Sequence, residues 1–498
     1  MSTDPRSPCI IGVARRTWHP ADVPDGAPEP LDMWEQMARA AAEDATSGTT
    51  TGSADVLRAV QSIDVVYSQS WQYDDPAARL AERLGAAPAR QHYSGIGGTI
   101  PQVLADDVAA HMLGGDLDLA LIVGAEALAT VRRLKKVGAE PHWSHAPSEP
   151  RPFPMTLRFY PSEIRHSVFE AFLTFALFDN ARRAHLGRGL DEHRAALGRV
   201  LAPMTEVAAA SPHAWFPVAR SPEEIVTATT DNRMVAYPYT KLMTSIMDVD
   251  MAAGLLMASA EKADALGVPD DRRVYLRGWG YNEDSDHVGD HPDLWRSPGM
   301  TAASQAALAG AGLGMDEVAH LDLYSCFASS ICFALDALGL SEDDQRGVTQ
   351  TGGLPYHGGP GSNFMTHSLA AMAETLRADP GSFGLTSGVG MHMQKHAFGL
   401  WSTEPGTVVP PPAPEKKWPR LIVDSAQGAA NVATYSVLHG RDGEPTAALL
   451  VCDLSGGGRC YAKLDGGPAA FEEIERDELI GRSVSLTASD GVNLARLA

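Results

Sequence analysis

The feature that most constrains the fold is an alternation of short apolar runs with amphipathic helical patterns, which occurs twice along the chain. This alternation is typical of α/β proteins, in which helices connect the strands of a sheet and cover its faces. Each half runs strand, helix, strand, helix, glycine-rich turn, helix, strand. We therefore predict an internal duplication of one α/β unit, although sequence identity between the two halves is weak.

The pattern also predicts the individual elements. In the first half, strands are expected at 8–13, 63–67 and 117–123, and helices at 31–45, 77–84 and 101–113. In the second half, a long helix is expected over 243–266, with strands at 273–279, 320–324 and 383–390 and helices at 298–309, 327–338 and 364–376.

Changes in composition along the chain suggest domain boundaries. Residues 127–240 are rich in Arg, Pro, His and aromatic residues, and we predict that they form a loop domain inserted between an N-terminal half (1–126) and a C-terminal half (241–407). The proline cluster within 408–418 predicts an extended linker. Beyond it, short strand patterns separated by glycine-rich turns predict a small β-barrel or sandwich over 419–498, with strands at 420–423, 430–438, 446–451 and 484–486.

The charge and the cysteines exclude several functional classes. A formal net charge of -22 disfavours nucleic acid and anionic membranes as partners, so an anionic substrate would need a local basic patch. The clearest basic cluster lies in the insertion, at Arg182, Arg183, Arg188 and Arg194. Five scattered cysteines fit a reducing cytoplasm without disulfides, and neither a signal peptide nor a membrane span is expected.

Several motifs, in the correct order, resemble those of the thiolase superfamily. They lie at 114–126, 232–239, 323–328, 352–361 and 387–390, and the resemblance covers roughly residues 8–400. The chain is most similar to thiolase-like proteins of type 1 with an additional C-terminal domain, often labelled acetyl-CoA acetyltransferase. The resemblance implies a duplicated five-layer α-β-α-β-α fold, a loop domain that holds coenzyme A, and a monomer or homodimer. It also implies an acyl-CoA thioester as substrate or ligand, no other cofactor, and a place in lipid metabolism.

The nucleophile expected from this resemblance is missing. The turn at 93–102 stands where a thiolase carries its catalytic cysteine, and it contains no thiol; the cysteines are Cys9, Cys326, Cys332, Cys452 and Cys460. Thiolase chemistry needs a thiolate, a His to take its proton, a second Cys as acid and base, and two oxyanion holes. The glycines of the turns could still donate backbone N–H groups to an oxyanion, and the candidates are Gly97, Gly98, Gly388 and Gly390.

The other catalytic positions of the family are also replaced. Gly359 aligns with the catalytic His, although a shift of one residue would bring His357 into the site, and both alignments stay open. Thr386 or Ser387 stands for the second Cys, and Tyr324 for the Asn, where a phenol could act as acid, base or oxyanion donor. Cys326 is the thiol nearest to these positions in sequence.

His392 and His396 have the spacing of a helical metal pair, but they follow a strand and have no evident third ligand. We therefore expect no metal site.

Three functions remain open from the sequence. The first is an acyl-CoA-binding enzyme without a cysteinyl intermediate, such as a carbon–carbon lyase that uses Tyr324. The second is an acetyltransferase with Cys326 as a displaced nucleophile. The third is a non-catalytic protein that binds acyl-CoA, or that binds a protein partner through residues 419–498.

Overall fold

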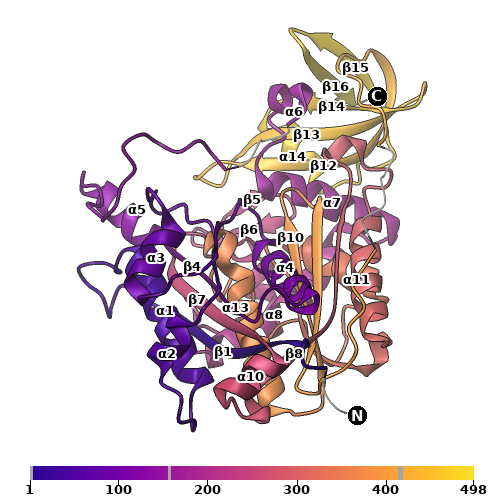
Figure 1. Ribbon diagram of the computed structural model, residues 1–498. Coiled ribbons are helices and arrows are strands. Elements are labelled where there is room, and N and C mark those ends of the chain that lie inside the picture. Colours follow the sequence, from indigo (N-terminus) through magenta and orange to yellow (C-terminus); the bar gives the residue numbers. More distant parts are fainter. Residues whose placement is uncertain (1–3, 155–158, 413–418, 498) are drawn as a thin grey trace.

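The computed structural model describes residues 4–154, 159–412 and 419–497. In these residues the main body is built on one mixed sheet of nine strands, in the order β3-β2-β4-β7-β1-β8-β11-β10-β9 (Figure 1). Its strands are β1 (Pro8–Thr17), β2 (Ser62–Val65), β3 (Arg90–Tyr93), β4 (Leu119–Ala127), β7 (Asp250–Ser259), β8 (Val274–Glu283), β9 (Val318–Asp322), β10 (Phe383–Gly390) and β11 (Lys395–Ser402).

The sheet consists of two halves with the same connectivity. The order β2-β4-β7-β1 in the first half matches β9-β10-β11-β8 in the second, and in each half the first pair is parallel and the next two are antiparallel. The halves join where Cys9 and Ile10 pair with Tyr275 and Val274. This symmetry confirms the predicted internal duplication.

Helices cover the two halves and fill the space between them. The outer helices of the first half are α1 (Pro30–Ala45), α2 (Ser53–Arg58) and α3 (Pro76–Leu84), and those of the second half are α11 (Pro298–Ala311) and α12 (Ala328–Leu338). Between the halves lie α4 (Ile100–Gly114), which contacts β7 and β11, and α13 (Phe364–Ala378), which contacts β7 and β10. The predicted five-layer α-β-α-β-α fold is therefore confirmed.

The helix predicted over 243–266 is wrong for most of its length. Residues 250–259 form β7, and helix α10 covers only Ala260–Leu266. Every residue of β7 is buried, because α1 packs on one face and α13 on the other. A strand covered on both faces has no polar alternation, so its run of Ala, Leu and Met looks like a helix in sequence.

The inserted region is mainly helical. It contains α5 (Leu128–Lys136), α6 (Pro161–His166), α7 (Ala171–His185), α8 (Leu190–Ala210), α9 (Pro222–Val226) and the short strands β5 (Met234–Ala236) and β6 (Tyr239–Thr240). Helix α7 packs both on α12 and on the C-terminal strand β12 (Gly428–His439), so it connects the second half with the C-terminal residues.

The C-terminal strands close into a small barrel, as predicted (Figure 1, yellow). Strands β13 (Pro445–Leu454), β14 (Arg459–Leu464), β16 (Val492–Leu497) and β15 (Ser483–Ser489) follow one another, and β12 pairs with both β13 and β15. Helix α14 (Pro468–Ile474) packs on β13. The strand predicted at 420–423 is wrong, since Ile422 forms only an isolated bridge with Arg459.

The predicted domain boundaries stay predictions, and residues 413–418 of the predicted linker lie outside the described residues. Among the helices of the described part, none is long and apolar enough to cross a membrane.

Candidate active site

Tyr324 and two glycine-rich segments meet at the N-terminus of α4. Tyr324 follows β9, Gly98 precedes α4, and Val389 lies near the end of β10. A Cβ atom added to Gly98 would lie 2.2 Å from the Tyr324 hydroxyl and 2.2 Å from the Val389 carbonyl oxygen. Only glycine allows the backbone this approach. The Tyr324 hydroxyl therefore packs directly against the glycine-rich turn that precedes α4.

The hydrogen-bonding groups of that turn are largely occupied. Ser94 is 3% exposed; its hydroxyl accepts from the Tyr67 N–H at 2.9 Å and donates to the Gly95 carbonyl at 2.9 Å. The Gly97 N–H, predicted as an oxyanion donor, donates to the Ser362 hydroxyl at 3.0 Å. These bonds shape the turn, and among the described residues the Ser94 hydroxyl has backbone groups as its partners and no side-chain base that would activate a nucleophile.

The loop on β10 is packed equally closely. The Ser387 hydroxyl accepts from the Tyr324 N–H at 3.0 Å, so it positions Tyr324. A Cβ at Gly388 would lie 2.3 Å from the Met365 sulfur, and one at Gly390 would lie 3.4 Å from the Thr99 hydroxyl. The neighbouring Thr386 donates to Gln102 at 3.0 Å. Ser387, Gly388 and Gly390 thus come together with Gly98 and Tyr324.

Phe364 connects His357 with this site. Nε2 of His357 is 3.3 Å from Nδ1 of His367, and Phe364 contacts the rings of both His357 and Tyr324 edge-on. In the other alignment, Gly359 takes the position of the family's His. A Cβ atom added to Gly359 would be 2.4 Å from the Ser245 hydroxyl. Gly359 therefore has no room for a side chain, and Phe364 contacts both His357 and Tyr324.

The His357–His367 pair should make stability depend on pH. Burial lowers the pKa of His357 to about 3 and that of His367 well below its usual range. In the unfolded chain, the imidazole takes up a proton below about pH 6.5, whereas the buried imidazole of the folded protein does not. The stability that each His contributes is therefore complete above pH ~6.5 and is lost as the pH falls towards the folded pKa. The loss is about 1.4 kcal/mol per pH unit for each His.

His357→Gln should therefore show a smaller decrease in unfolding free energy between pH 7 and pH 5 than the wild type, measured by urea denaturation at each pH. An unchanged pH dependence would show that His357 is not held neutral by burial.

Tyr324 and Cys326 differ in what they can do chemically. Burial raises the pKa of Tyr324 above its usual range, so the phenol stays protonated and can donate a hydrogen bond or a proton. Burial raises the pKa of Cys326 to about 12, and its thiol donates to the Ser330 hydroxyl at 3.7 Å. At neutral pH Cys326 is a thiol, which is a poor nucleophile.

The glycine-rich loop 352–363 also borders a large cavity, through Pro355 and Tyr356. The volume of this cavity is about 810 Å³, and Ile246 links it to the loop because the Ile246 carbonyl accepts from the Gly359 N–H at 2.8 Å. Tyr356 reaches it from the loop and has a buried hydroxyl without a partner among the described residues. The lining comprises Arg132, Phe216, Arg220, Glu223, Glu224, Thr227, Thr229, Asp231, Asn232, Lys241, Leu242, Ile246, Asp248, Pro355 and Tyr356.

Two cations of this cavity are available to a ligand. Arg132 is paired with Asp248, but neither Arg220 nor Lys241 forms an ion pair with a described residue. The lining also carries the carboxylates of Glu223, Glu224, Asp231 and Asp248, so an anion would have to bind on the side of Arg220 and Lys241. Sequence reasoning missed this site, because its cations are separated in sequence and converge only in the fold.

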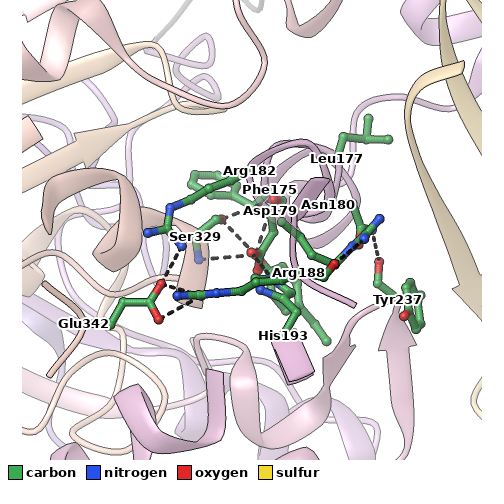
Figure 2. Close-up of polar contacts among 12 residues, drawn as sticks. Phe175, Leu177, Asp179, Asn180, Arg182, Arg188, His193, Tyr237, Ser329 and Glu342 are labelled. Carbon is green, nitrogen blue, oxygen red and sulfur yellow. Dashed lines mark hydrogen bonds and ion pairs between the residues drawn. The ribbon is translucent and has the colours of Figure 1, made fainter. Parts of the chain in front are cut away.

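The predicted arginine cluster is occupied by internal ion pairs (Figure 2). Arg182, 3% exposed, pairs with Asp336 and Glu342 at 2.6 Å each. Arg188 binds Glu342 at 2.8 Å, and Arg183 binds Glu478 of the C-terminal region at 2.5 Å. Coenzyme A binding by these three arginines stays an untested prediction, but their guanidinium groups already have carboxylate partners.

The two histidines considered for a metal lie apart from a helix. His392 is in the turn after β10, where burial lowers its pKa to about 4, and His396 is on β11, 2.9 Å from Asp284. The described residues contain no group of three or more His, Cys, Asp or Glu side chains arranged to hold a metal ion.

Comparison with solved structures includes a match over the full length of the chain. A monomeric SCP2-thiolase like protein type 1 from Mycobacterium smegmatis matches with a TM-score of 0.85 and 31% identity over 100% of both chains. Acetyl-CoA acetyltransferase from Syntrophomonas wolfei (TM-score 0.56, 16% identity) covers 80% of this chain and 99% of its own. The dimeric peroxisomal thiolase of Saccharomyces cerevisiae (TM-score 0.57, 13% identity) covers 81% of this chain and 99% of its own. At these identities, the last two matches show the fold alone. No family model and no curated protein matches the chain.

Proposed function

Because the chain belongs to the thiolase superfamily, as a thiolase-like protein of type 1, we propose that it binds an acyl-CoA thioester and acts on it without a covalent cysteinyl intermediate. The observation that supports this proposal is the contact between the protonated phenol of Tyr324 and Gly98, in the turn that contains no thiol. The hydroxyl of Ser94 is already committed to backbone groups.

A neutral phenol suits one part of the chemistry. Tyr324 can donate to the oxygen of a thioester carbonyl or of the enolate formed from it, which lowers the energy of developing negative charge. A carbon–carbon lyase also needs a base, and His357 is a weak one because burial lowers its pKa to about 3. Tyr324 therefore acts in the proposed reaction as a hydrogen-bond donor to this oxygen, because the raised pKa that keeps the phenol protonated also makes it a weak acid.

Close packing favours a second candidate, a protein that binds acyl-CoA without transforming it. Gly98, Gly359 and Gly388 each have a neighbouring atom within 2.4 Å of an added Cβ, so little space remains between the loops. Under both candidates the coenzyme A part occupies the same cavity.

We place coenzyme A in the 810 Å³ cavity, with its phosphates near Arg220 and Lys241 and its pantetheine arm directed to Tyr356. This cavity has the size of a small-ligand pocket, and its apolar residues Phe216, Leu242 and Ile246 could hold the adenine or the arm.

Arg220→Gln should weaken coenzyme A binding about tenfold, since a charge-assisted hydrogen bond contributes about 1.5–3 kcal/mol. Isothermal titration of the full chain with coenzyme A measures this effect. Arg58→Gln, an exposed arginine of α2, is the matched control and should keep the wild-type affinity. Equal affinities of wild type and Arg220→Gln would exclude this cavity, and no binding by the wild type would exclude the proposed function.

The reading with Cys326 as a displaced nucleophile is less well supported. A pKa of about 12 leaves roughly one thiol in 10⁵ ionised at neutral pH. Cys326 also lies beyond Tyr324 at the start of α12, with its thiol turned to Ser330.

We further propose a monomer in a reducing compartment such as the cytoplasm. The similar protein from Mycobacterium smegmatis is described as monomeric. The edge strand β3 is short and presents Gln91 and His92 to solvent, which disfavours pairing with a second sheet. All five cysteines are free. Light scattering on the titration samples should give the mass of one chain, and twice that mass would contradict the monomer.

A protein partner for residues 419–498 stays a proposal. The barrel is itself held by the rest of the chain, through Tyr461 and Glu163 at 2.7 Å and through Arg183 and Glu478. A partner would therefore bind its outer surface. Capture of a partner by the full chain, but not by a chain ending at residue 412, would support this role.

A further inference from the structure

A second cavity lies next to the turn before α4 and shares no lining residue with the large one. Its volume is about 380 Å³, within the range of small-ligand pockets. It is lined by Tyr67, Gln72, Tyr73, Tyr93, Ser94, Arg151, Pro152 and Pro154.

Most polar groups of this lining are already paired. The Tyr73 hydroxyl accepts from the Leu31 N–H at 2.9 Å, and the Tyr93 hydroxyl accepts from the Ser68 N–H at 3.0 Å. Ser94 is bonded to backbone groups on both sides. The tyrosine rings and the two prolines therefore give the cavity flat, mainly apolar walls.

Two donors remain for a ligand. The Tyr67 hydroxyl makes no hydrogen bond to a described residue, and burial together with Glu126 raises its pKa, so it stays protonated. Arg151 forms no ion pair within the described ranges; its guanidinium donates only to the Asp74 carbonyl, and its charge acts on the Tyr93 hydroxyl.

Gln72 holds Arg151 in place at the cavity. Its Oε1 accepts from the Arg151 N–H at 3.0 Å, and its Nε2 donates to the Arg151 carbonyl at 3.4 Å. These two bonds fix the backbone of the exposed Arg151, and the guanidinium bond to the Asp74 carbonyl restrains its side chain, so part of the cost of ordering it for an anion is already met.

We propose that this cavity is a separate binding site for a small carboxylate with a flat apolar body, such as an aromatic or arylalkenoic acid. The carboxylate accepts from Arg151 and from the Tyr67 hydroxyl, and the ring packs against the wall formed by Tyr67, Tyr73 and Tyr93. This site goes beyond the proposed function, because it does not depend on coenzyme A.

The test uses the full chain and trans-cinnamate as probe, measured by isothermal titration. Arg151→Gln should weaken binding at least about tenfold and Tyr67→Phe about threefold, as expected for a charged and a neutral hydrogen bond. Cinnamamide, which has the same ring but no charge, should bind at least about tenfold more weakly than cinnamate. Arg58→Gln should bind cinnamate like the wild type.

Three results would overturn the proposal. The first is no binding of cinnamate, and the second is equal binding by wild type and Arg151→Gln. The third is competition by saturating coenzyme A, which would place cinnamate in the large cavity. Coenzyme A binding is titrated separately, so failure of this site and failure of the proposed function are distinguishable.

Discussion

Gly98→Ala is expected to lower the free energy of unfolding by about 3 kcal/mol, at the upper end of the usual effect of overpacking. The added methyl group would lie 2.2 Å from both the Tyr324 hydroxyl and the Val389 carbonyl. The carbonyl belongs to the backbone of β10, which is paired with β11, so the sheet cannot easily move away. Urea denaturation followed by circular dichroism measures the change.

Gly95→Ala is the matched control in the same turn. Its added Cβ would meet only the Pro154 carbonyl at 3.6 Å, which is ordinary contact. We expect its stability to be unchanged or slightly raised, because alanine reduces the freedom of the unfolded chain. If Gly98→Ala were as stable as Gly95→Ala, the loops around Tyr324 would be open rather than closely packed.

Arg182→Met should also lower the free energy of unfolding by about 3 kcal/mol, although methionine keeps much of the apolar packing. The guanidinium binds Asp336 and Glu342 in a site where Arg182 is 3% exposed. Its loss leaves the partly buried Asp336 without its cation and leaves Glu342 with Arg188 alone (Figure 2). We expect coenzyme A affinity, measured by titration below the unfolding temperature, to stay at the wild-type value.

Arg194→Met removes a neighbouring arginine whose side chain is 39% exposed and paired with Asp191. Exposed pairs contribute about 0–1 kcal/mol, so this variant should be nearly as stable as the wild type. If Arg182→Met lost coenzyme A affinity without losing stability, the phosphates would bind at the arginine cluster. This result would contradict the proposed site at Arg220 and Lys241.

The sequence predicted the architecture because periodicity reports which faces of an element are buried. Residues 31–45, for example, were predicted as a helix, and Met33, Trp34, Met37 and Ala38 are buried in α1. Periodicity carries no such information for β7, which is buried on every side. The strands β3 and β11 were not predicted; the first is only four residues long and polar.

The candidate site was predictable as a set of segments but not as a set of contacts. The sequence indicates where the glycine-rich turns and Tyr324 stand, because their order follows a recognisable pattern. It does not indicate that Gly98 touches Tyr324, that Phe364 contacts both Tyr324 and His357, or that Arg182 is buried. The first and the last of these depend on residues more than 100 positions apart, Gly98 with Tyr324 and Arg182 with Asp336.

The central claim is that the protein handles acyl-CoA without an acylated cysteine. Intact-mass spectrometry after incubation of the full chain with acetyl-CoA tests it most directly, with Cys326→Ala as a parallel sample and a thiol-free buffer to preserve any thioester. The protonated, partly buried thiol of Cys326 and the absence of a thiol in the turn before α4 predict an unchanged mass in both samples. An added acetyl group on any cysteine would contradict the claim, and its loss in Cys326→Ala would identify Cys326 as the nucleophile.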